Sequence, residues 1–182
     1  MLYNKRMSET FPKSRDHLLY MSEEAAAFYP RNFYPFDNFS AFQVEWRGRL
    51  WPTVEHVYQA SKFFDTAPEV AEAVFSAISP HDAYKFGQVH KHRRPADWEK
   101  VKVGVMEEIV RAKVSQHYYV QKKLLETGNR AIIEDSPKDS FWGWGPNRDL
   151  ENGNALGKIW MKLRTELQIG QIALLPEPSY EV

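Results

Sequence analysis

The stretch around which this chain is organised is Trp51-Pro52-Thr53-Val54-Glu55-His56-Val57-Tyr58-Gln59-Ala60-Ser61-Lys62-Phe63. Pro52 and Thr53 open a helix, since proline is favoured at the first helical position. Side chains that suit a buried face then recur with helical spacing at Val54, Val57, Tyr58, Ser61 and Phe63 or Phe64. The stretch predicts a helix that runs to about residue 64, which we call the glutamate helix.

One face of the glutamate helix is polar. Glu55, Gln59 and Lys62 stand at positions i, i+4 and i+7, and seven steps of about 100° return to within roughly 20° of the starting direction. This face borders the apolar stripe, so we expect desolvation to raise the pKa of the Glu55 carboxyl and to lower the pKa of the Lys62 amine. Acid–base or imine chemistry uses such shifts. The same spacing is compatible with structural roles, in which Glu55 interacts with the positive end of the helix dipole and Lys62 is a surface cation.

The sequence on either side of the glutamate helix is mainly helical. Residues 42–46 and 49–51 flank Arg47-Gly48, which predicts a short hairpin because glycine supplies a positive φ. Further helices are predicted from Pro68 through Val70, Val74 and Ile78, from Ser79-Pro80 to Gly87, after Asp97 along Trp98, Val101, Val105, Ile109 and Ala112, up to Gly128, and from Asn154 along Leu156, Ile159, Leu163 and Leu167. Ser79, Asp97 and Asn154 are the expected N-caps of their helices. Ile132-Ile133 is expected to be a buried strand or extended piece. Because strands and helices do not alternate, the pattern predicts a mainly α fold, an orthogonal multi-helix bundle with a small β-hairpin.

Length and composition indicate one globular domain over residues 1–182, with tails outside about 26–168 that we expect to be mobile. Lys plus Arg number 24 and Asp plus Glu number 24, so no net field attracts a polyanion. The absence of cysteine excludes disulfides, a thiolate nucleophile and sulfur-ligated zinc. No apolar run approaches the roughly 18 residues of a membrane span, and we expect a cytoplasmic protein with no membrane association.

Several common sites are missing from the sequence. It contains no glycine-rich phosphate cradle of the Rossmann or P-loop kind and no Gly-x-Ser-x-Gly. His56 lacks a second histidine one turn on, and His90 and His92 have no acidic neighbour, so we predict no metal site and no cofactor.

The segment from Ser136 to Gly145 has the composition of a binding loop. It combines Asp139 with Trp142, Trp144 and two glycines, and aromatic faces stack on bases or sugars. Asp139 could equally bond backbone amides within a turn while the tryptophans fill the core. A second feature is a local excess of positive charge, either a solvated face or a site for phosphates, at Lys85, Lys91, Arg93, Arg94, Lys100 and Lys102.

Over about residues 26–168 the chain resembles the NADAR, or YbiA-like, family. The resemblance is carried by the stretch 51–63 together with Phe28-Tyr29, Asn38-Phe39, Trp98-Glu99, Ala112-Lys113, Trp142-Gly143 and Asn154-Ala155-Leu156-Gly157-Lys158. It implies an N-glycosidase that hydrolyses a bond between ribose and an exocyclic amine. The implied substrate is either ADP-ribose on guanine in nucleic acid or a ribosylaminopyrimidine intermediate of riboflavin biosynthesis.

The resemblance also implies roles for individual residues. Glu55, Lys62 and Asp139 are the catalytic candidates, and the substrate would be bound by Asn38, Phe39, Trp98, Lys113, Trp142 and Asn154. No obligate protein partner is expected. Two other functions are compatible with the residues: a non-catalytic module that binds ADP-ribose or NAD, and a structural nucleic-acid binder that uses the basic cluster of residues 85–102.

Overall fold

The computed structural model describes residues 25–28 and 34–179. The chain forms two compact units, unit 1 with residues 1–37 and 121–173 and unit 2 with residues 38–120 and 174–182. The predicted mobility of the N-terminal tail falls on residues outside the described ones. Residues 174–179, which include Pro176 and Pro178, form neither helix nor strand. The prediction of a single domain stays a prediction.

Unit 2 begins with the predicted hairpin. Strands β2 (Val44–Trp46) and β3 (Arg49–Trp51) pair antiparallel, with Trp46 opposite Arg49. The two residues of the turn both have positive φ, 50° at Arg47 and 74° at Gly48. This is the backbone conformation of a type I′ hairpin turn, which explains why glycine is needed at the second position. The hairpin prediction is confirmed.

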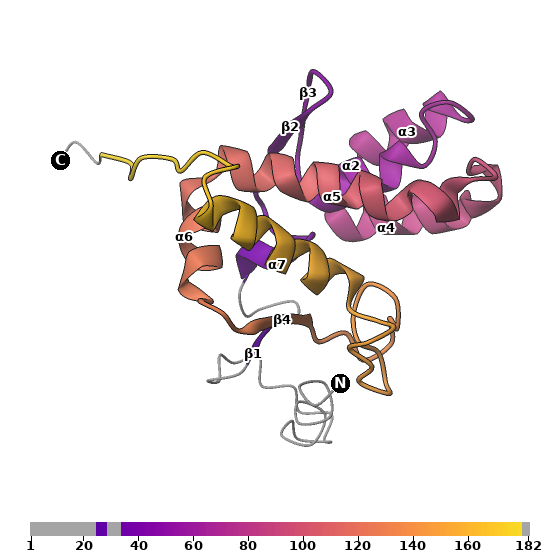
Figure 1. Ribbon diagram of the computed structural model, residues 1–182. Coiled ribbons are helices and arrows are strands. Elements are labelled where there is room, and N and C mark those ends of the chain that lie inside the picture. Colours follow the sequence, from indigo (N-terminus) through magenta and orange to yellow (C-terminus); the bar gives the residue numbers. More distant parts are fainter. Residues whose placement is uncertain (1–24, 29–33, 180–182) are drawn as a thin grey trace. The chain divides into compact units, whose positions relative to one another are not determined.

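Helix α2 (Val54–Ser61) is the predicted glutamate helix, and it lies in the interior of unit 2. It contacts α3 (Pro68–Phe75), α4 (Pro80–Val89) and α5 (Trp98–Gln116) (Figure 1). Every residue from Val54 to Ala60 is buried. A helix that is covered on nearly all sides must bury its polar residues as well, and this places the polar face of α2 inside the protein.

The remaining helices of unit 2 correct several predicted boundaries. Helix α2 ends at Ser61 instead of about residue 64, and α4 continues past Gly87 to Val89. Helix α3 ends at Phe75, which leaves Ile78 99% exposed. Ser79 caps α4 as predicted, because its hydroxyl accepts a hydrogen bond from the Asp82 amide. A short 3-10 helix, η2 (Lys91–Arg93), follows.

Helix α5 starts where predicted and buries Trp98 and Ile109 of the predicted face, whereas Val105 and Ala112 are half-buried. Asp97 occupies the N-cap position without a side-chain capping bond, and the predicted core position Val101 is 42% exposed. The buried residues are Trp98, Met106, Ile109, Val110, Lys113 and Val114. The apolar pattern predicted Val101 to be buried, whereas the buried valines are Val110 and Val114. The buried face also includes a lysine, Lys113, which an apolar pattern does not select.

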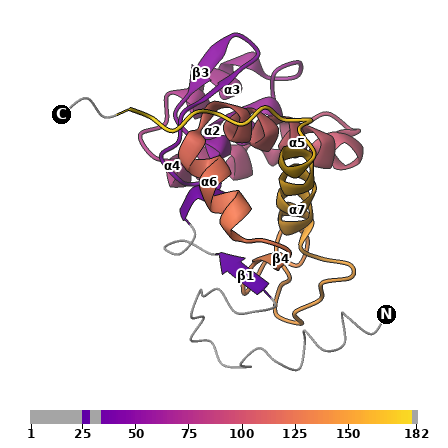
Figure 2. The same cartoon turned by 60° about the vertical axis from the view of Figure 1, so that its left-hand side comes forward.

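Helix α6 (Tyr118–Glu126) carries the chain from unit 2 into unit 1. Unit 1 contains a parallel two-stranded sheet in which β1 (Ala25–Phe28) pairs with β4 (Ala131–Glu134), with Ala25 opposite Ala131 (Figure 2). Strand β4 includes the predicted Ile132-Ile133 piece, whereas β1 was not predicted. A 3-10 helix, η1 (Tyr34–Phe36), also belongs to this unit, and the Trp160 indole donates to its Phe36 carbonyl at 3.2 Å.

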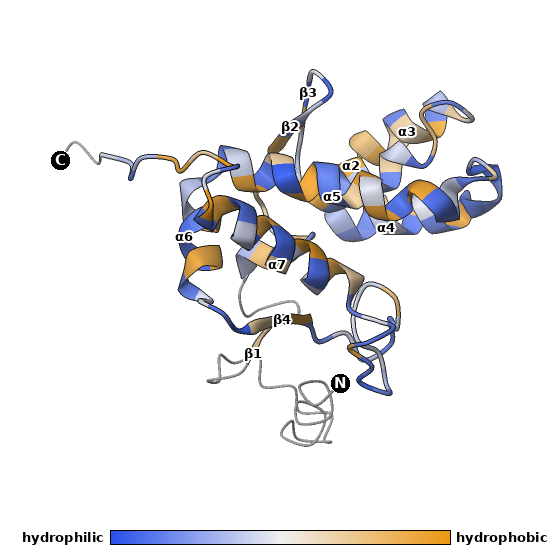
Figure 3. Cartoon of the chain, viewed as in Figure 1, coloured by the Kyte–Doolittle hydropathy of each residue, from blue (hydrophilic) through white to orange (hydrophobic). Residues whose placement is uncertain are grey.

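Helix α7 (Ala155–Gln168) packs on β4. Its buried residues include the four predicted ones, Leu156, Ile159, Leu163 and Leu167. Orange and blue residues follow one another along α5 and α7 in Figure 3, as expected for helices with one buried and one exposed face. Six α-helices and two small sheets lie in the described part of the chain, so the prediction of a mainly α fold is confirmed. Within those residues no helix combines the length and the apolar character needed to cross a bilayer.

Candidate active site

The polar face of α2 forms a buried hydrogen-bonded chain. Glu55, Gln59 and Lys62 are only 5%, 2% and 4% exposed. The Gln59 Nε2 amide donates to Glu55 Oε1 at 2.7 Å, and Lys62 Nζ donates to Gln59 Oε1 at 2.6 Å. The interpretation of Lys62 as a surface cation is therefore wrong. An acid and an amine are held in one buried, continuous polar row.

The start of α2 fixes the backbone that carries this row. Thr53 is the N-cap, and its hydroxyl accepts a hydrogen bond from the His56 amide. The Glu55 amide donates to the Asn38 carbonyl at 3.0 Å. The His56 ring lies between the Thr53 hydroxyl, at 2.8 Å from Nδ1, and the Ala77 carbonyl, at 3.1 Å from Nε2.

His56 is a structural histidine. Burial lowers its pKa, so the ring stays neutral near pH 7. In the neutral ring Nε2 donates to the Ala77 carbonyl and Nδ1 accepts from the Thr53 hydroxyl, because a carbonyl can only accept. The ring thus ties α2 to the segment between α3 and α4 next to Glu55.

Lys62 lies against aromatic rings. Its Nζ is 4.7 Å from the centre of the Tyr58 ring and 6.0 Å from that of Trp98, and the two rings are 5.6 Å apart. Trp98 is therefore at the candidate site, as the resemblance implied. Tyr58 was assigned only to the apolar stripe, although its position four residues before Lys62 on one helix could have indicated the contact.

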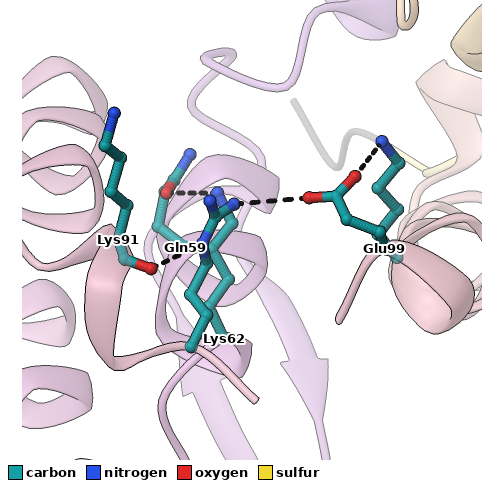
Figure 4. Close-up of polar contacts among 6 residues, drawn as sticks. Gln59, Lys62, Lys91 and Glu99 are labelled. Atoms are coloured by element: carbon teal, nitrogen blue, oxygen red, sulfur yellow. Dashed lines mark hydrogen bonds and ion pairs between the residues drawn. The ribbon is translucent and has the colours of Figure 1, made fainter. Parts of the chain in front are cut away.

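Burial lowers the pKa of Lys62 to about 8. Glu55 and Glu99 oppose this shift, and Arg94 and Lys102 add to it. Figure 4 shows the hydrogen bond between the Lys62 amine and the Gln59 amide, and the Glu99 carboxylate of α5 with its own partners, Arg94 and Lys102. The direction of this shift is the one predicted from the sequence. The amine can supply a neutral nucleophile at a pH where an exposed lysine remains charged.

The basic cluster of residues 85–102 is partly neutralised. Lys102 Nζ lies 2.6 Å and Arg94 3.7 Å from the Glu99 carboxylate, and Arg93 lies 2.6 Å from Glu69. Lys85, Lys91 and Lys100 are exposed. Since half of its positive charges have acidic partners, the cluster has the character of a solvated, mixed-charge face.

Asn38, Phe39 and Lys113 also belong to unit 2. Asn38 Oδ1 is buried and has no hydrogen-bond partner among the described residues, while its Nδ2 donates to the Met106 sulfur at 3.6 Å. Lys113 is fully buried, and its Nζ donates to the Ser40 hydroxyl at 2.7 Å. Phe39 is half-buried. Lys113 is thus a buried lysine in the last turn of α5.

Asp139, Trp142 and Asn154 belong to unit 1. Asp139 Oδ1 accepts the backbone amides of Phe141 and Trp142 at 2.8 Å each, which is the turn-bonding arrangement. Trp142 is half-buried and meets the Phe141 ring edge to face, whereas Trp144 is buried and donates to Asp135. The loop therefore uses one tryptophan for the core and leaves the other partly accessible.

Asn154 does not cap α7 with its side chain, which corrects the prediction from sequence. Its backbone is left-handed, with φ 59°. Its side-chain oxygen accepts the Glu134 amide at 2.9 Å, and its Nδ2 donates to the Ile132 carbonyl at 2.9 Å. The residue thus fastens the start of α7 to β4. It also lines a cavity of about 660 Å³ within unit 1, together with Asn129, Ala131, Leu150, Glu151, Lys158 and Met161. The substrate contacts of the three unit 1 residues stay predictions.

No group of three or more His, Asp or Glu side chains suited to a metal ion occurs among the residues that the structure describes. The chemistry available in unit 2 is that of a buried carboxylate, a buried amine and an amide between them. Such a set moves protons and forms an imine.

Comparison with known proteins gives the family. The family model described as the NADAR domain matches residues 19–168. The chain belongs to the NADAR domain family. A relative from Nostoc punctiforme, named N-glycosidase Npun_R5314, is 36% identical over 134 residues, which cover 73% of this chain and 85% of the relative. N-glycosidase YbiA of Escherichia coli is 35% identical over 134 residues, 74% of this chain and 81% of that protein.

Two further comparisons extend this result to the fold and to a longer relative. The NMR structure of Escherichia coli YbiA matches 93% of this chain and all of that chain, with a TM-score of 0.70 and 29% identity. The maize (Zea mays) chloroplastic riboflavin biosynthesis protein PYRR is 34% identical over 148 residues, but this chain spans only 23% of its length. The predicted family is confirmed, and the predicted enzyme class, a hydrolase acting on N-glycosyl bonds, is the class that the names of the bacterial relatives state.

Proposed function

We propose that this NADAR domain hydrolyses the bond between ribose C1 and an exocyclic amine, with Lys62 as nucleophile and Glu55 as proton carrier. The buried row of Glu55, Gln59 and Lys62 carries this proposal, because it holds an amine of lowered pKa and a carboxylate on one helix face. Relatives named N-glycosidase support the reaction class.

An exocyclic amine offers a route that a ring nitrogen does not. Its lone pair expels the ribose ring oxygen, which takes a proton from Glu55, and C1 becomes an open-chain imine. Neutral Lys62 then adds to C1 and forms a C–N bond. The base leaves as a free amine after accepting a proton, and C1 remains joined to Nζ as a protonated Schiff base.

Water completes the cycle. With Glu55 as base it adds to C1, and the C1–Nζ bond breaks, which returns the amine of Lys62 and leaves the open-chain sugar to reclose. The net reaction consumes one water and yields the amino-base and the sugar with a hydroxyl at C1, which is ADP-ribose where the substrate carries that group. The competing route is direct attack of water on an oxocarbenium-like centre, with Glu55 or Asp139 stabilising the positive charge.

The other predicted site residues receive binding roles in this proposal. Trp98 offers an aromatic face beside Lys62 on which the base or ribose can stack. Asn38 has a buried Oδ1 that could accept a substrate hydroxyl, which would compensate the cost of burying that atom. Phe39 and Lys113 of unit 2 shape the walls of the proposed site. The substrate roles that the resemblance implies for Asp139, Trp142 and Asn154 of unit 1 stay predictions.

Two substrates fit this chemistry: ADP-ribose attached to guanine in nucleic acid, and a ribosylaminopyrimidine intermediate of riboflavin biosynthesis. The name of the maize relative supports the second. Zero net charge and the partly neutralised basic cluster give little support to a large nucleic-acid footprint. We propose to incubate the protein with each substrate and to follow release of the free base by chromatography.

Borohydride reduction during turnover separates the two mechanisms. It should leave substrate ribose covalently attached to Lys62, identified by peptide mass spectrometry. Lys62→Arg should lose turnover and adduct together, because arginine is not nucleophilic at neutral pH, whereas the matched variant Lys100→Arg on the exposed face should retain both. Near-normal turnover of Lys62→Arg would contradict the imine route.

A non-catalytic module that binds ADP-ribose or NAD would use the same aromatic walls. Glu55→Gln distinguishes the two functions, because the amide keeps the shape but cannot carry the proton. We expect turnover to fall by about 10²- to 10⁴-fold with little change in ligand affinity. Glu108→Gln, at an exposed glutamate of α5, is the control.

A further inference from the structure

Gln59 stands between the two reacting groups, and each end of its amide faces the type of partner that it requires. Oε1 can only accept, and it accepts a hydrogen bond from Lys62 Nζ at 2.6 Å. Nε2 can only donate, and it reaches Glu55 Oε1 at 2.7 Å. Reversing the amide would set donor against donor at Lys62. Only one orientation of the Gln59 amide therefore satisfies both hydrogen bonds.

Gly87 on α4 lies directly against this amide. A Cβ added at Gly87 would lie 2.1 Å from Gln59 Oε1 and 3.0 Å from its Cδ. Glycine is not needed here for a left-handed backbone, because the residue is in the body of α4. Helix propensity alone would favour alanine at such a position. The reason for a glycine is the close approach of Gln59.

We propose that Gln59 is a positioning residue that orients the Lys62 amine and the Glu55 carboxylate, and that Gly87 provides the space in which its amide is held. This inference rests on the proposed function. One N–H of the amine is fixed by Oε1, so the lone pair of neutral Lys62 must point elsewhere than toward Gln59. An amine held in one orientation attacks C1 more often than one that rotates freely.

The surroundings of Lys62 make the role of the amide measurable. The charged groups that act on its amine are Glu55 from α2, Arg94 after η2, and Glu99 and Lys102 from α5. The rings of Tyr58 and Trp98 cover other sides. None of these residues is altered by a substitution at Gly87, so a change in the titration of Lys62 would report the displaced amide.

Gly87→Ala tests the proposal without removing any polar group. The atom in the way is the end of a flexible side chain, so we expect the fold to persist while the Gln59 amide rotates away from Nζ. Gly104→Ala is the matched control, because Gly104 is also in a helix but its added Cβ meets nothing within 4 Å. Gln59→Leu, of similar size, removes the amide directly.

The first readout is the titration of Lys62 without substrate, followed by NMR of ¹³C-labelled lysine and assigned with Lys62→Arg. Loss of an acceptor from a buried ammonium should lower the Lys62 pKa by about one unit in Gly87→Ala and in Gln59→Leu, and leave it unchanged in Gly104→Ala. In the same two variants kcat should fall at least about tenfold, with KM nearly unchanged.

An unchanged or raised Lys62 pKa in both variants would overturn the positioning role. If Gly87→Ala fails to fold by circular dichroism, the Gln59→Leu titration decides alone. Should the unaltered protein hydrolyse neither substrate, the proposed function fails, but the titration still shows whether Gln59 and Gly87 hold the amine.

Discussion

At the scale of single residues, Lys62 is the most informative position. Removing an ammonium from water is costly, and a protein offsets part of that cost by neutralising the amine. Lys62 shows this response, because burial lowers its pKa to about 8. A buried lysine lowers the stability of the folded protein, and such a residue is expected where the chemistry needs a neutral amine.

The lowered pKa predicts the pH dependence of the reaction. If neutral Lys62 is the nucleophile, about one molecule in ten is competent at pH 7 and about half at pH 8, given a pKa of about 8. The rate kcat should therefore rise between pH 6.5 and 8.5, measured by base release in single-substrate assays. A rate that is flat across this range would show that the ionisation of Lys62 does not limit the reaction.

The same shift predicts a pH dependence of stability. Unfolded Lys62 titrates near 10.5 and folded Lys62 near 8, so between these values the unfolded state binds more protons. Stability from this group therefore rises with pH over that window, by up to about 3 kcal/mol. The measurement is urea unfolding of the unaltered protein and of Lys62→Met at pH 7.5 and 10. Relative to Lys62→Met, the unaltered protein should have a higher free energy of unfolding at pH 10 than at pH 7.5. A difference in unfolding free energy that is the same at both pH values would contradict the shift.

The sequence allowed the site to be predicted only in part. Glu55 and Lys62 could be paired because seven helical positions return to the same face. The contact of Lys113 with Ser40 joins residues 73 positions apart, and no local pattern indicates it. The role of Gly87 was likewise hidden, since only the packing of α4 on α2 brings it to Gln59.

At the scale of elements, local signals gave the hairpin and α2 but not the sheet of unit 1. Strand β1 includes Ala25, Ala26 and Ala27, and alanine is a poor strand former, so the propensity is weak. Its stability comes from pairing with β4 more than a hundred residues later, where Ala25 faces Ala131. Long-range pairing of this kind leaves no periodic trace in either segment.

The junction of α7 with β4 gives a prediction at this scale. A Cβ at Gly157 would lie 2.1 Å from the Ile132 carbonyl and 2.4 Å from the Asn154 side chain, and a backbone atom cannot move aside cheaply. Gly157→Ala should therefore destabilise the protein by about 1–3 kcal/mol. Gly104→Ala, in open space, should instead stabilise it by up to about 1 kcal/mol. Thermal unfolding followed by circular dichroism compares them, and equal effects of the two substitutions would contradict the tight contact.

At the scale of the whole molecule, the chain forms two compact units, whereas its length predicts one domain that folds cooperatively. Unit 1 is discontinuous in the sequence, because residues 38–120 of unit 2 come between its two segments, 1–37 and 121–173. Bringing the two segments of unit 1 together closes a loop of the chain between them. This costs conformational entropy unless the intervening chain is itself folded. The family model also spans both units, over residues 19–168.

Cooperative folding has a direct test in hydrogen exchange. Gly157→Ala acts within unit 1, so in a single cooperative domain it should lower the protection of the slowest amides of α2, in unit 2, by the same free energy as those of β4. At about 2 kcal/mol this is roughly a thirtyfold faster exchange at both places. Gly104→Ala, within unit 2, should slow exchange at both. If Gly157→Ala accelerates β4 and leaves α2 untouched, the chain has two independently unfolding units and the glutamate helix does not depend on unit 1 for its stability.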